Sequence, residues 1–225
     1  MSKDQFKPLS FEQSSLSKEE WRELKKLSNP KKIQDFLNSL KFNFEKKGET
    51  HKSVRETLRT RTAHCFEGGL LAAAALWIAG RRPLILDLKT VRPDFDHIVA
   101  LFQDLETGTW GAISKTNHAV LRYREPIYRD IQELVMSYFH EYFLFSGKKT
   151  LRSFSEPFDL SKIMPNHTQK NGGGVNWLTT EENLAPLVHV IDLSLHTRIV
   201  TPKQVKKFRL ADKIEIQAGK LTEYK

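Results

Sequence analysis

Residues 61–80 read RTAHCFEGGLLAAAALWIAG, and this stretch organises the chain. It contains Cys65, the only cysteine in 225 residues. Leucines and alanines from Leu70 to Leu76 are strong helix formers and carry no charge, which predicts a helix buried on nearly all sides and ended by Gly80. We expect Cys65 in its first turn. There, unpaired backbone N–H groups and the positive end of the helix dipole favour a thiolate over a thiol.

Cys65 has two interpretations. Free cysteine is among the most buried residue types, and in an alanine-rich helix it often acts only as a small hydrophobic residue. A nucleophilic cysteine needs a positive microenvironment and a base within hydrogen-bonding reach. The choice between packing and chemistry therefore depends on finding that base among the eight histidines of the chain.

The composition limits the classes of protein to which this chain can belong. A chain of 225 residues with 39% hydrophobic residues has enough apolar material for one principal domain. No apolar run reaches the ~18 residues of a membrane span, and the N-terminus lacks the apolar segment of a secretory signal, so we expect a cytoplasmic protein without membrane contact. One cysteine excludes an internal disulfide framework and a multi-cysteine zinc cluster. We expect no metal and no cofactor.

The chain is basic, with 36 lysines and arginines against 27 acidic residues and a formal charge of +9. Such a charge attracts anionic surfaces. The excess is scattered over separated dibasic pairs and a lysine-rich tail instead of one dense block. A scattered excess is typical of solvated surface, so we do not expect specific nucleic-acid binding.

Helix-start signals divide the first third of the chain. Residues 1–16 show no periodicity, and we expect them to be loose. Ser17 begins a capping box with the acid three residues later, Asn29 caps a helix whose first residue is proline, and Ser53 repeats the capping pattern. We therefore expect a core over residues 17–147 that includes these N-terminal helices, with residues 148–225 as a C-terminal extension packed on it.

Three apolar segments predict strands, over residues 83–88, 97–102 and 109–114. A turn through Glu106-Thr107-Gly108 joins the last two, which predicts an antiparallel hairpin. Residues 126–142 carry aromatic and aliphatic side chains at helical spacing, so we expect an amphipathic helix that begins at Pro126. The glycine triplet at 172–174 lacks the lysine of a phosphate-binding loop, and we interpret it as a flexible turn.

His97 is the best-placed candidate base for Cys65. It lies at the start of a predicted strand, directly after a polar loop, where its side chain can face a helix N-terminus. His64 is the sequence neighbour of Cys65, and consecutive residues give poor mutual side-chain geometry. His118 is the next alternative. Each of these histidines has a structural interpretation as well, as a ring satisfied by hydrogen bonds.

The order of these residues resembles the transglutaminase-like superfamily, the papain-like group that also includes arylamine N-acetyltransferases. The similarity consists of a cysteine on a buried helix, a histidine at the start of a strand and a tryptophan-containing strand next. Cys65-Phe66-Glu67 followed by two leucines is also similar to the cysteine segment of the acetyltransferase branch. The resemblance covers roughly residues 53–118, under a third of the chain.

The resemblance implies an α+β fold with a papain-like core. In it, a buried helix bearing the cysteine packs on a small antiparallel sheet, with extra N- and C-terminal helices around it. By position, Cys65 would be the nucleophile and His97 its base. The implied aspartate, a few residues after Trp110, is missing, and the strand leads to Ser114 instead. Asparagine orients the histidine in papain-like proteases, so we expect Asn117 or Ser114 to hold the ring.

The predicted function is thiol-dependent acyl transfer or amide hydrolysis on a protein or a small amide or thioester. Arg61, Arg122, Arg124 and Trp110 are the candidate substrate-binding residues, because arginines bind anionic groups. The alternative is a catalytically inactive module of the same fold, in which Cys65 is packing and residues 115–124 recognise a protein or anionic partner. The missing aspartate favours the module. The presence of both Cys65 and His97 favours the enzyme, which we take as the prediction.

Overall fold

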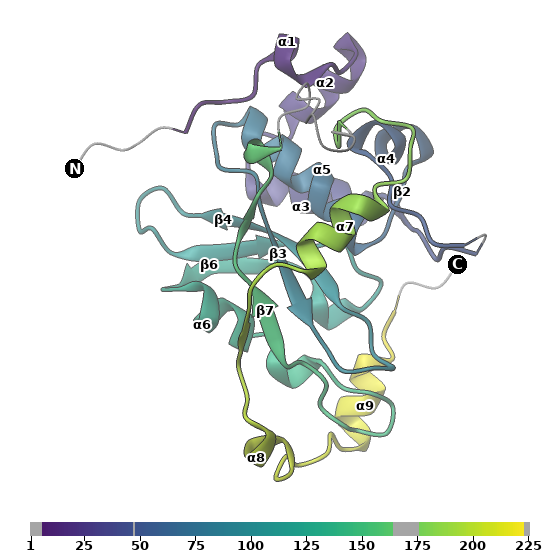
Figure 1. The fold of residues 1–225 in the computed structure, drawn as a ribbon, viewed down its shortest axis with the longest axis vertical. Helices are drawn as coiled ribbons and strands as arrows, with labels where there is room; N and C mark the ends of the chain where they lie inside the picture. The colour runs from purple at the N-terminus through teal and green to yellow at the C-terminus, as the bar shows by residue number, and fades with distance from the viewer. Residues whose placement is uncertain (1–5, 47, 164–175, 223–225) are drawn as a thin grey trace.

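The computed structural model describes residues 6–46, 48–163 and 176–222, and their fold is α+β (Figure 1). The described α-helices are α1 (Phe11–Ser14), α2 (Lys18–Lys26), α3 (Pro30–Ser39), α4 (Val54–Thr60), α5 (Cys65–Ile78), α6 (Ile131–Met136), α7 (Ala185–Asp192), α8 (Pro202–Val205) and α9 (Lys213–Gly219). The strands are β1 (Lys41–Phe42), β2 (Thr62–Ala63), β3 (Leu84–Lys89), β4 (His97–Gln103), β5 (Trp110–Ile113), β6 (Arg124–Tyr128), β7 (Ser153–Ser155), β8 (Phe158–Asp159) and β9 (His196–Arg198). Short 3₁₀ helices are η1 (Ala119–Leu121), η2 (Phe139–Glu141) and η3 (Leu160–Lys162).

The main sheet is antiparallel and has the strand order β6-β5-β4-β3-β7-β9, with β8 also paired to β3. Its three central strands are the three predicted from apolar segments. Leu88 is opposite His97 at one end of the β3–β4 pair, and Ala100 is opposite Ile113 in the β4–β5 pair. The expected hairpin between β4 and β5 is confirmed, and the register puts the start of β4 beside the end of β5.

Helix α5 lies across one face of this sheet and is the centre of the larger core cluster. Its residues from Phe66 to Trp77 are all buried, as the uncharged leucine and alanine run predicts. Two glycines let it approach the sheet closely. A Cβ atom on Gly68 would lie 2.4 Å from Cβ of Lys115, and one on Gly69 would lie 2.9 Å from a methyl group of Ile98.

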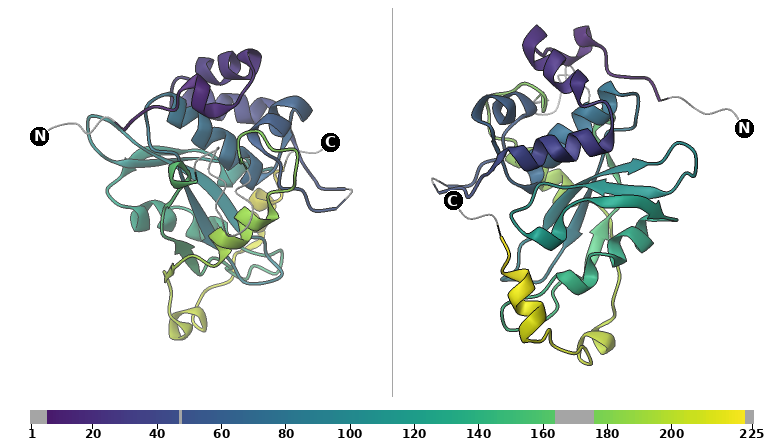
Figure 2. Two further views of the ribbon diagram at one scale, coloured as in Figure 1. Left: turned by 45° about the horizontal axis from the view of Figure 1, so that its top comes forward. Right: turned by 180° about the vertical axis from the view of Figure 1, so that it is seen from behind.

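Other helices enclose the remaining sides of α5. Helices α2, α3 and α4 lie over it at the end of the molecule where the chain begins, which the view from behind also shows (Figure 2). Helix α7 covers a further side, and the segment before it stacks Trp177 on Trp77, with ring centroids 6.4 Å apart. In the described part of the chain, no helix is both long and apolar enough to cross a membrane.

The predicted caps of the N-terminal helices are confirmed. The Ser17 side chain accepts from the backbone N–H of Glu20, whose carboxylate accepts from the backbone N–H of Ser17 at 2.7 Å. Asn29 caps α3 with proline as its first residue, and Ser53 caps α4. These side chains replace hydrogen bonds that the first turn of a helix leaves unmade.

The expectation of a loose N-terminus does not hold for residues 6–16. Helix α1 has its own capping box, formed by Ser10 and Gln13. Leu9 is buried and donates its backbone N–H to the carbonyl of Trp77 at 3.2 Å. Leu9 and Leu16 join the core beside α5, so burial of two leucines orders a segment that has no periodicity of its own. Residues 1–5 lie outside the described residues.

The aromatic helix expected over residues 126–142 is wrong. The chain first forms β6, an edge strand of the main sheet, which tolerates Pro126 because one side of an edge strand needs no ladder hydrogen bond. Asp130 then caps the short α6, and η2 follows. Side chains from α6 and η2, with Tyr138 and Tyr142 on either side of η2, form a second core cluster with the face of the sheet opposite α5.

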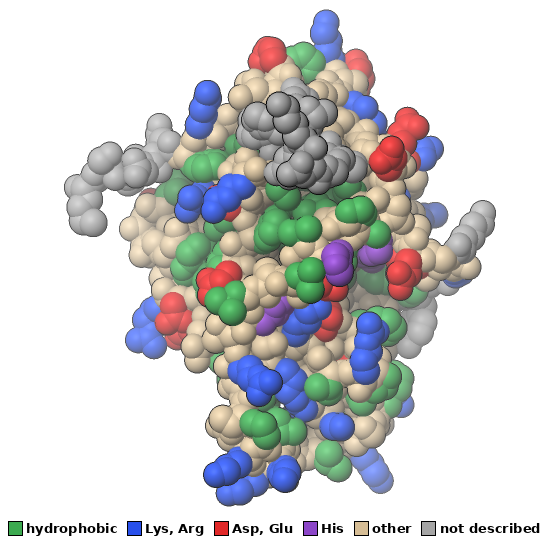
Figure 3. Space-filling model, in the orientation of Figure 1, with side chains coloured by type: hydrophobic (Ala, Val, Ile, Leu, Met, Phe, Trp, Pro, Cys, Tyr) green, Lys and Arg blue, Asp and Glu red, His purple; other side chains and the backbone are tan. Residues whose placement is uncertain are grey.

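The predicted boundary at residue 147 is also wrong, because the C-terminal part supplies strands to the main sheet. β7 pairs with β3 at Leu88 and Lys89, β8 pairs with β3 at its other end, and β9 pairs with β7. No pattern in the sequence predicts these strands, because each is only two or three residues long. The basic C-terminal segment lies at the end of the molecule that carries α8. Lysine and arginine side chains gather on this end (Figure 3). Residues 172–174 lie outside the described residues.

Candidate active site

Cys65 is the first residue of α5, at the place the sequence predicts. The short parallel pair of β1 and β2 delivers the chain to His64, which is the N-cap with an extended backbone (φ −101°, ψ −168°). Cys65 is partly exposed and is not in a disulfide. The thiol therefore sits at the positive end of a buried helix.

Two histidines surround this thiol. Burial alone raises the pKa of Cys65, but hydrogen bonds to the rings of His64 and His97 and the positive charge of those rings lower it further than burial raises it. The net pKa lies well below the ordinary value of a thiol. Such surroundings favour the thiolate over the thiol, and the thiolate is the form that attacks carbonyl groups.

His97 begins β4 and is buried, with 6% of its surface exposed. Its Nε2 lies 2.8 Å from Oγ of Ser114, and that hydroxyl donates to the backbone carbonyl of Leu121 at 3.0 Å. A serine hydroxyl has a single proton. Because Ser114 gives this proton to Leu121, His97 Nε2 must carry a proton and donate it to Ser114. The other nitrogen, Nδ1, is the one left for the hydrogen bond between His97 and Cys65.

Ser114 is itself rigidly held. It is fully buried, directly after β5. The amide of Gln34 on α3 pairs with its backbone on both sides: Gln34 Oε1 accepts from the N–H of Ser114 at 3.0 Å, and Gln34 Nε2 donates to its carbonyl at 2.9 Å. The sequence analysis missed Gln34, because nothing in the sequence distinguishes one buried glutamine on an amphipathic helix.

Of the two orienting residues expected for His97, the structure brings Ser114 and not Asn117 to the ring. Asn117 is partly exposed, and in the described chain no hydrogen bond joins it to His97. The side chain of His118, the alternative base, also points to a different part of the structure. Its Nδ1 lies 3.2 Å from the carbonyl of Gly219 at the end of α9, so its role is to hold the C-terminal helix.

The structure corrects the expectation that His64 has poor geometry toward Cys65. As N-cap, its side chain folds back over the first turn, where Nδ1 accepts from the N–H of Phe66 at 3.3 Å and the ring also meets Cys65. Nε2 lies 2.7 Å from the carbonyl of Thr50. Burial lowers the pKa of His64, but hydrogen bonding to Cys65 and the negative charges nearby raise it to about 9.

Glu67 fixes the loop in front of the site. Its carboxylate is fully buried in the first turn of α5 and accepts from the backbone N–H groups of His64 and Lys52 at 3.0 and 3.2 Å. It also accepts from the side chains of Asn43 and Thr50, and Lys52 Nζ lies 3.5 Å away. One buried charge thus ties residues 43–52 to the helix that carries Cys65. The sequence marks Glu67 as the one acidic residue in an otherwise uncharged helix.

The arginines expected to bind substrate are occupied by the protein itself. Arg61 pairs with both oxygens of Glu23, at 2.5 and 3.0 Å, and so ties the end of α4 to α2. Arg124 donates to Ser137 at 2.9 Å, pairs with Glu141, and stacks over the ring of Tyr138 at 4.0 Å. These two guanidinium groups brace helices and strands instead of facing Cys65.

Trp110 is also not brought to the site. It opens β5, four residues before Ser114, so the two are about 13 Å apart along the strand. There it packs on the second core cluster and is opposite Tyr128 of β6. Arg122 lies at the end of η1, with its backbone carbonyl accepting from Arg124 at 3.4 Å.

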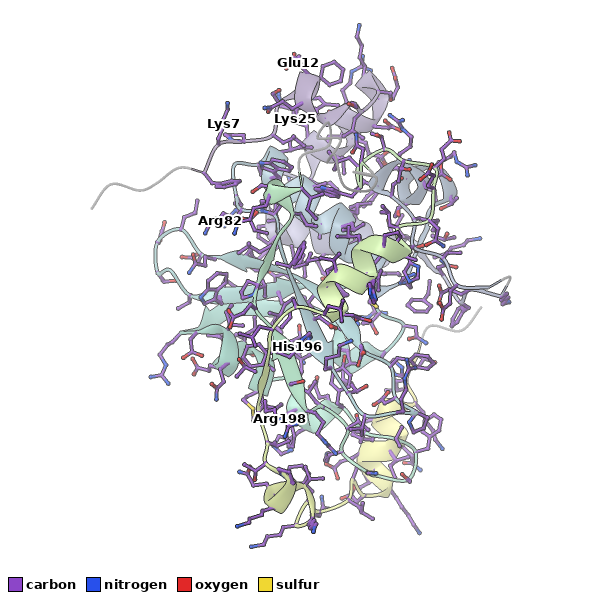
Figure 4. All side chains as sticks on the ribbon, viewed as in Figure 1. Lys7, Glu12, Lys25, Arg82, His196 and Arg198 are labelled. Carbon is purple, nitrogen blue, oxygen red and sulfur yellow. The ribbon has the colours of Figure 1, made fainter. Side chains whose placement is uncertain are left out.

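A charged cluster supports the β3–β4 connection next to His97. Lys89 Nζ lies 2.8 Å from Asp96, 2.7 Å from Asp192 and 3.3 Å from the buried Asp87. His196 on β9, labelled in Figure 4, reaches Asp87 with Nε2 at 3.2 Å. Burial raises the pKa of Asp87. The cluster joins α7 and β9 to the loop that positions His97.

Two hollows in the described surface lie away from Cys65. One lies between the start of α3, the end of β4 and Tyr123, and the other between α2 and α3. Among the described residues, no group of three or more histidine, cysteine, aspartate or glutamate side chains is arranged to hold a metal ion. A scan against protein-family models and a search of curated proteins both found no match for this chain.

Proposed function

We propose that this protein is a thiol-dependent enzyme that transfers or hydrolyses an acyl group, built on a papain-like, transglutaminase-like core. The observation that carries the proposal is the chain of contacts from Cys65 through His97 to Ser114. It joins a thiol of lowered pKa, an imidazole with one free nitrogen and a group that fixes the tautomer of that imidazole. These are the three parts of a nucleophile–base–orienter arrangement.

The chemistry follows from these contacts. The thiolate of Cys65 attacks the carbonyl carbon of an amide, ester or thioester and forms a C–S bond, while the carbonyl π electrons move to oxygen. The oxyanion is met at the start of α5 by the backbone N–H of Cys65, which has no intrahelical partner, since His64 already accepts from the N–H of Phe66. The leaving group departs with a proton from an imidazolium. His97 then takes a proton from water or an amine, which attacks the thioester and releases the thiolate.

The direct test is acylation of Cys65 by p-nitrophenyl acetate, an activated ester that needs no substrate-specific pocket. We expect a burst of p-nitrophenol equal to the enzyme concentration, and mass spectrometry should locate an acetyl group on the peptide that contains Cys65. The matched control is Cys65→Ser, which should give no burst. His97→Ala should accumulate the acetyl-enzyme, because the base for deacylation is gone. Native protein that acquires no acetyl group would contradict the proposal.

The alternative, an inactive module that binds a protein or an anionic partner, is favoured by one observation. Two surface hollows lie away from Cys65, and the one at the start of α3 is lined by Lys31 and Arg81 together with Asp104 and Glu125. A binding module predicts that Lys31→Glu with Arg81→Glu weakens partner capture while Cys65→Ser has no effect. The enzyme predicts the reverse for ester turnover.

A further inference from the structure

The orientation of the His64 ring is fixed at both nitrogens. Nε2 lies 2.7 Å from the carbonyl oxygen of Thr50, which only accepts hydrogen bonds, so Nε2 carries a proton. Nδ1 accepts from the backbone N–H of Phe66 at 3.3 Å and therefore presents a lone pair on the side of the ring that meets Cys65. Before any proton moves, Nδ1 is an acceptor at the start of α5, and when it takes the thiol proton it gives up the hydrogen bond from Phe66.

The charges around His64 favour a second proton on its ring. Carboxylate oxygens of Glu45 and Glu67 lie 3.5 and 3.7 Å from Nε2. The charge of Lys52 is directed at Glu67, with Nζ 3.5 Å from the carboxylate. The ring of His51 lies 6.0 Å away, centroid to centroid.

His97 and Tyr142 are the titratable groups on the far side of Cys65. The charge of Cys65 acts on Tyr142, and burial raises the pKa of that phenol well above its ordinary value, so it stays neutral. His97 has a different environment from His64, because its Nε2 donates to the neutral hydroxyl of Ser114. In the part of the chain that is described, no carboxylate lies within ion-pair distance of the His97 ring, whereas two lie near His64.

We infer that His64 is a second catalytic histidine, whose Nδ1 takes the thiol proton of Cys65 and later gives it to the leaving group. His97 serves as the base of the second half-reaction. This inference rests on the proposed acyl-transfer function and divides its proton transfers between two rings. The raised pKa of His64, about 9, is consistent with a ring that keeps this proton at neutral pH.

The protons and bonds balance over the cycle. The S–H bond of Cys65 breaks and an N–H bond forms at His64 Nδ1, which creates a thiolate–imidazolium pair. After the thiolate adds to the carbonyl, the C–N, C–O or C–S bond to the leaving group breaks and that group takes the proton from His64. In the second half, His97 Nδ1 takes a proton from water or an amine while the acceptor adds. The C–S bond then breaks, and the proton on His97 returns to the thiolate.

The test compares how fast iodoacetamide alkylates Cys65 in the wild type, His64→Asn and His97→Ala between about pH 5 and pH 10. Asparagine is as good an N-cap as any residue, so His64→Asn keeps an acceptor for the N–H of Phe66 while removing the imidazole. We expect His64→Asn to lower the alkylation rate at about pH 6.5 by at least tenfold, as the thiol pKa moves toward that of free cysteine. His97→Ala should lower it less than about threefold, since the base that ionises the thiol is still present.

Each outcome separates this inference from the proposed function. If His97→Ala raises the thiol pKa and His64→Asn leaves it in place, the division of roles is wrong, but the acyl-transfer proposal stands. If the wild-type thiol titrates like free cysteine, the proposed function fails, and the inference fails with it.

A second measurement covers the case in which His64→Asn does not fold. Proton–nitrogen NMR of ¹⁵N-histidine-labelled protein reports the protonation of each ring directly. In the wild type, we expect the His64 ring to be doubly protonated at about pH 7.5. In Cys65→Ser, the pH at which His64 titrates should fall by about one unit or more, because the thiolate is gone. A His64 ring that is neutral at pH 7.5 in the wild type would overturn the inference.

Discussion

The Nε2 atom of His97 lies 2.8 Å from the hydroxyl oxygen of Ser114, and the same hydroxyl donates to the carbonyl of Leu121. A neutral serine thus occupies the place that an acidic residue would take in a charged triad. Hydrogen bonds to a neutral acceptor are about half as strong as those to a carboxylate. Ser114 fixes the tautomer of His97 without stabilising an imidazolium, which suits a ring that acts from its neutral form.

Replacement of Ser114 tests this positioning role. In Ser114→Ala, the His97 ring loses the hydrogen bond at Nε2, and we expect kcat for ester turnover to fall by roughly 10²–10⁴, within the range known for loss of an orienting residue. Ser114→Thr keeps the hydroxyl and should recover most of the rate. Steady-state kinetics with circular dichroism as a folding control would measure both. Full activity in a folded Ser114→Ala protein would remove serine from the mechanism.

Gly68 permits the close contact between α5 and Lys115. A Cβ atom at this position would lie 2.4 Å from Cβ of Lys115, so Gly68→Ala forces the helix away from the sheet. We expect the free energy of unfolding to fall by about 1–3 kcal/mol, as for other overpacked cores. Gly69→Ala is the matched variant, because its Cβ would meet only a methyl group of Ile98, at 2.9 Å. Urea unfolding should show the smaller loss for Gly69→Ala, and equal effects would contradict the packing argument.

Glu67 holds the loop of residues 43–52 against α5. Glu67→Gln keeps the shape but removes the charge that Lys52 and several N–H and O–H donors share, so we expect a loss of about 1–3 kcal/mol in unfolding free energy. Glu67→Ala leaves those donors buried without a partner and should cost about 3–5 kcal/mol. Thermal unfolding checks the order of the two variants. The account of this loop is wrong if both variants match the wild type.

The pKa values of the cysteine and of His64 predict a bell-shaped dependence of kcat/KM on pH. At low pH, activity should rise as Cys65 loses its proton, well below the ordinary pKa of a thiol. At high pH, activity should fall near pH 9, where His64 loses the proton that it gives to the leaving group. An amide substrate should show the descending limb. An activated ester, which needs no proton on its leaving group, should not show it. A descending limb of equal size for both substrates would contradict the assignment.

Much of the fold can be predicted from the sequence where hydrophobic periodicity and helix-capping residues agree. The alanine-rich run predicts α5 because no charged residue interrupts it, and the capping residues Ser17, Asn29 and Ser53 each begin a helix. The C-terminal strands were missed because two- and three-residue strands have no measurable alternation. Their place is set by pairing with β3, a long-range contact that local sequence does not encode.

Some residues of the candidate site can also be predicted from the sequence, and others cannot. Cys65 and His97 are marked by element boundaries, since each is the first residue of its helix or strand, and Ser114 follows the strand that pairs with β4. Gln34 lies 80 residues from Ser114 in sequence, so only the tertiary packing of α3 brings it there. The sequence disfavours His64 as the base for Cys65, because the side chains of consecutive residues rarely meet. The change from extended backbone at the N-cap to helix at the next residue is what turns its ring toward the thiol.

The most direct test of an activated thiolate is the rate at which iodoacetamide alkylates Cys65 at about pH 6 in folded protein, compared with protein unfolded in urea. A thiol with an ordinary pKa of about 8.5 is almost fully protonated at that pH. We predict that the folded protein reacts at least about tenfold faster than the unfolded chain, because its cysteine is already a thiolate. If Cys65 reacts only after unfolding, it is a packing residue, and the chain is not a thiol enzyme.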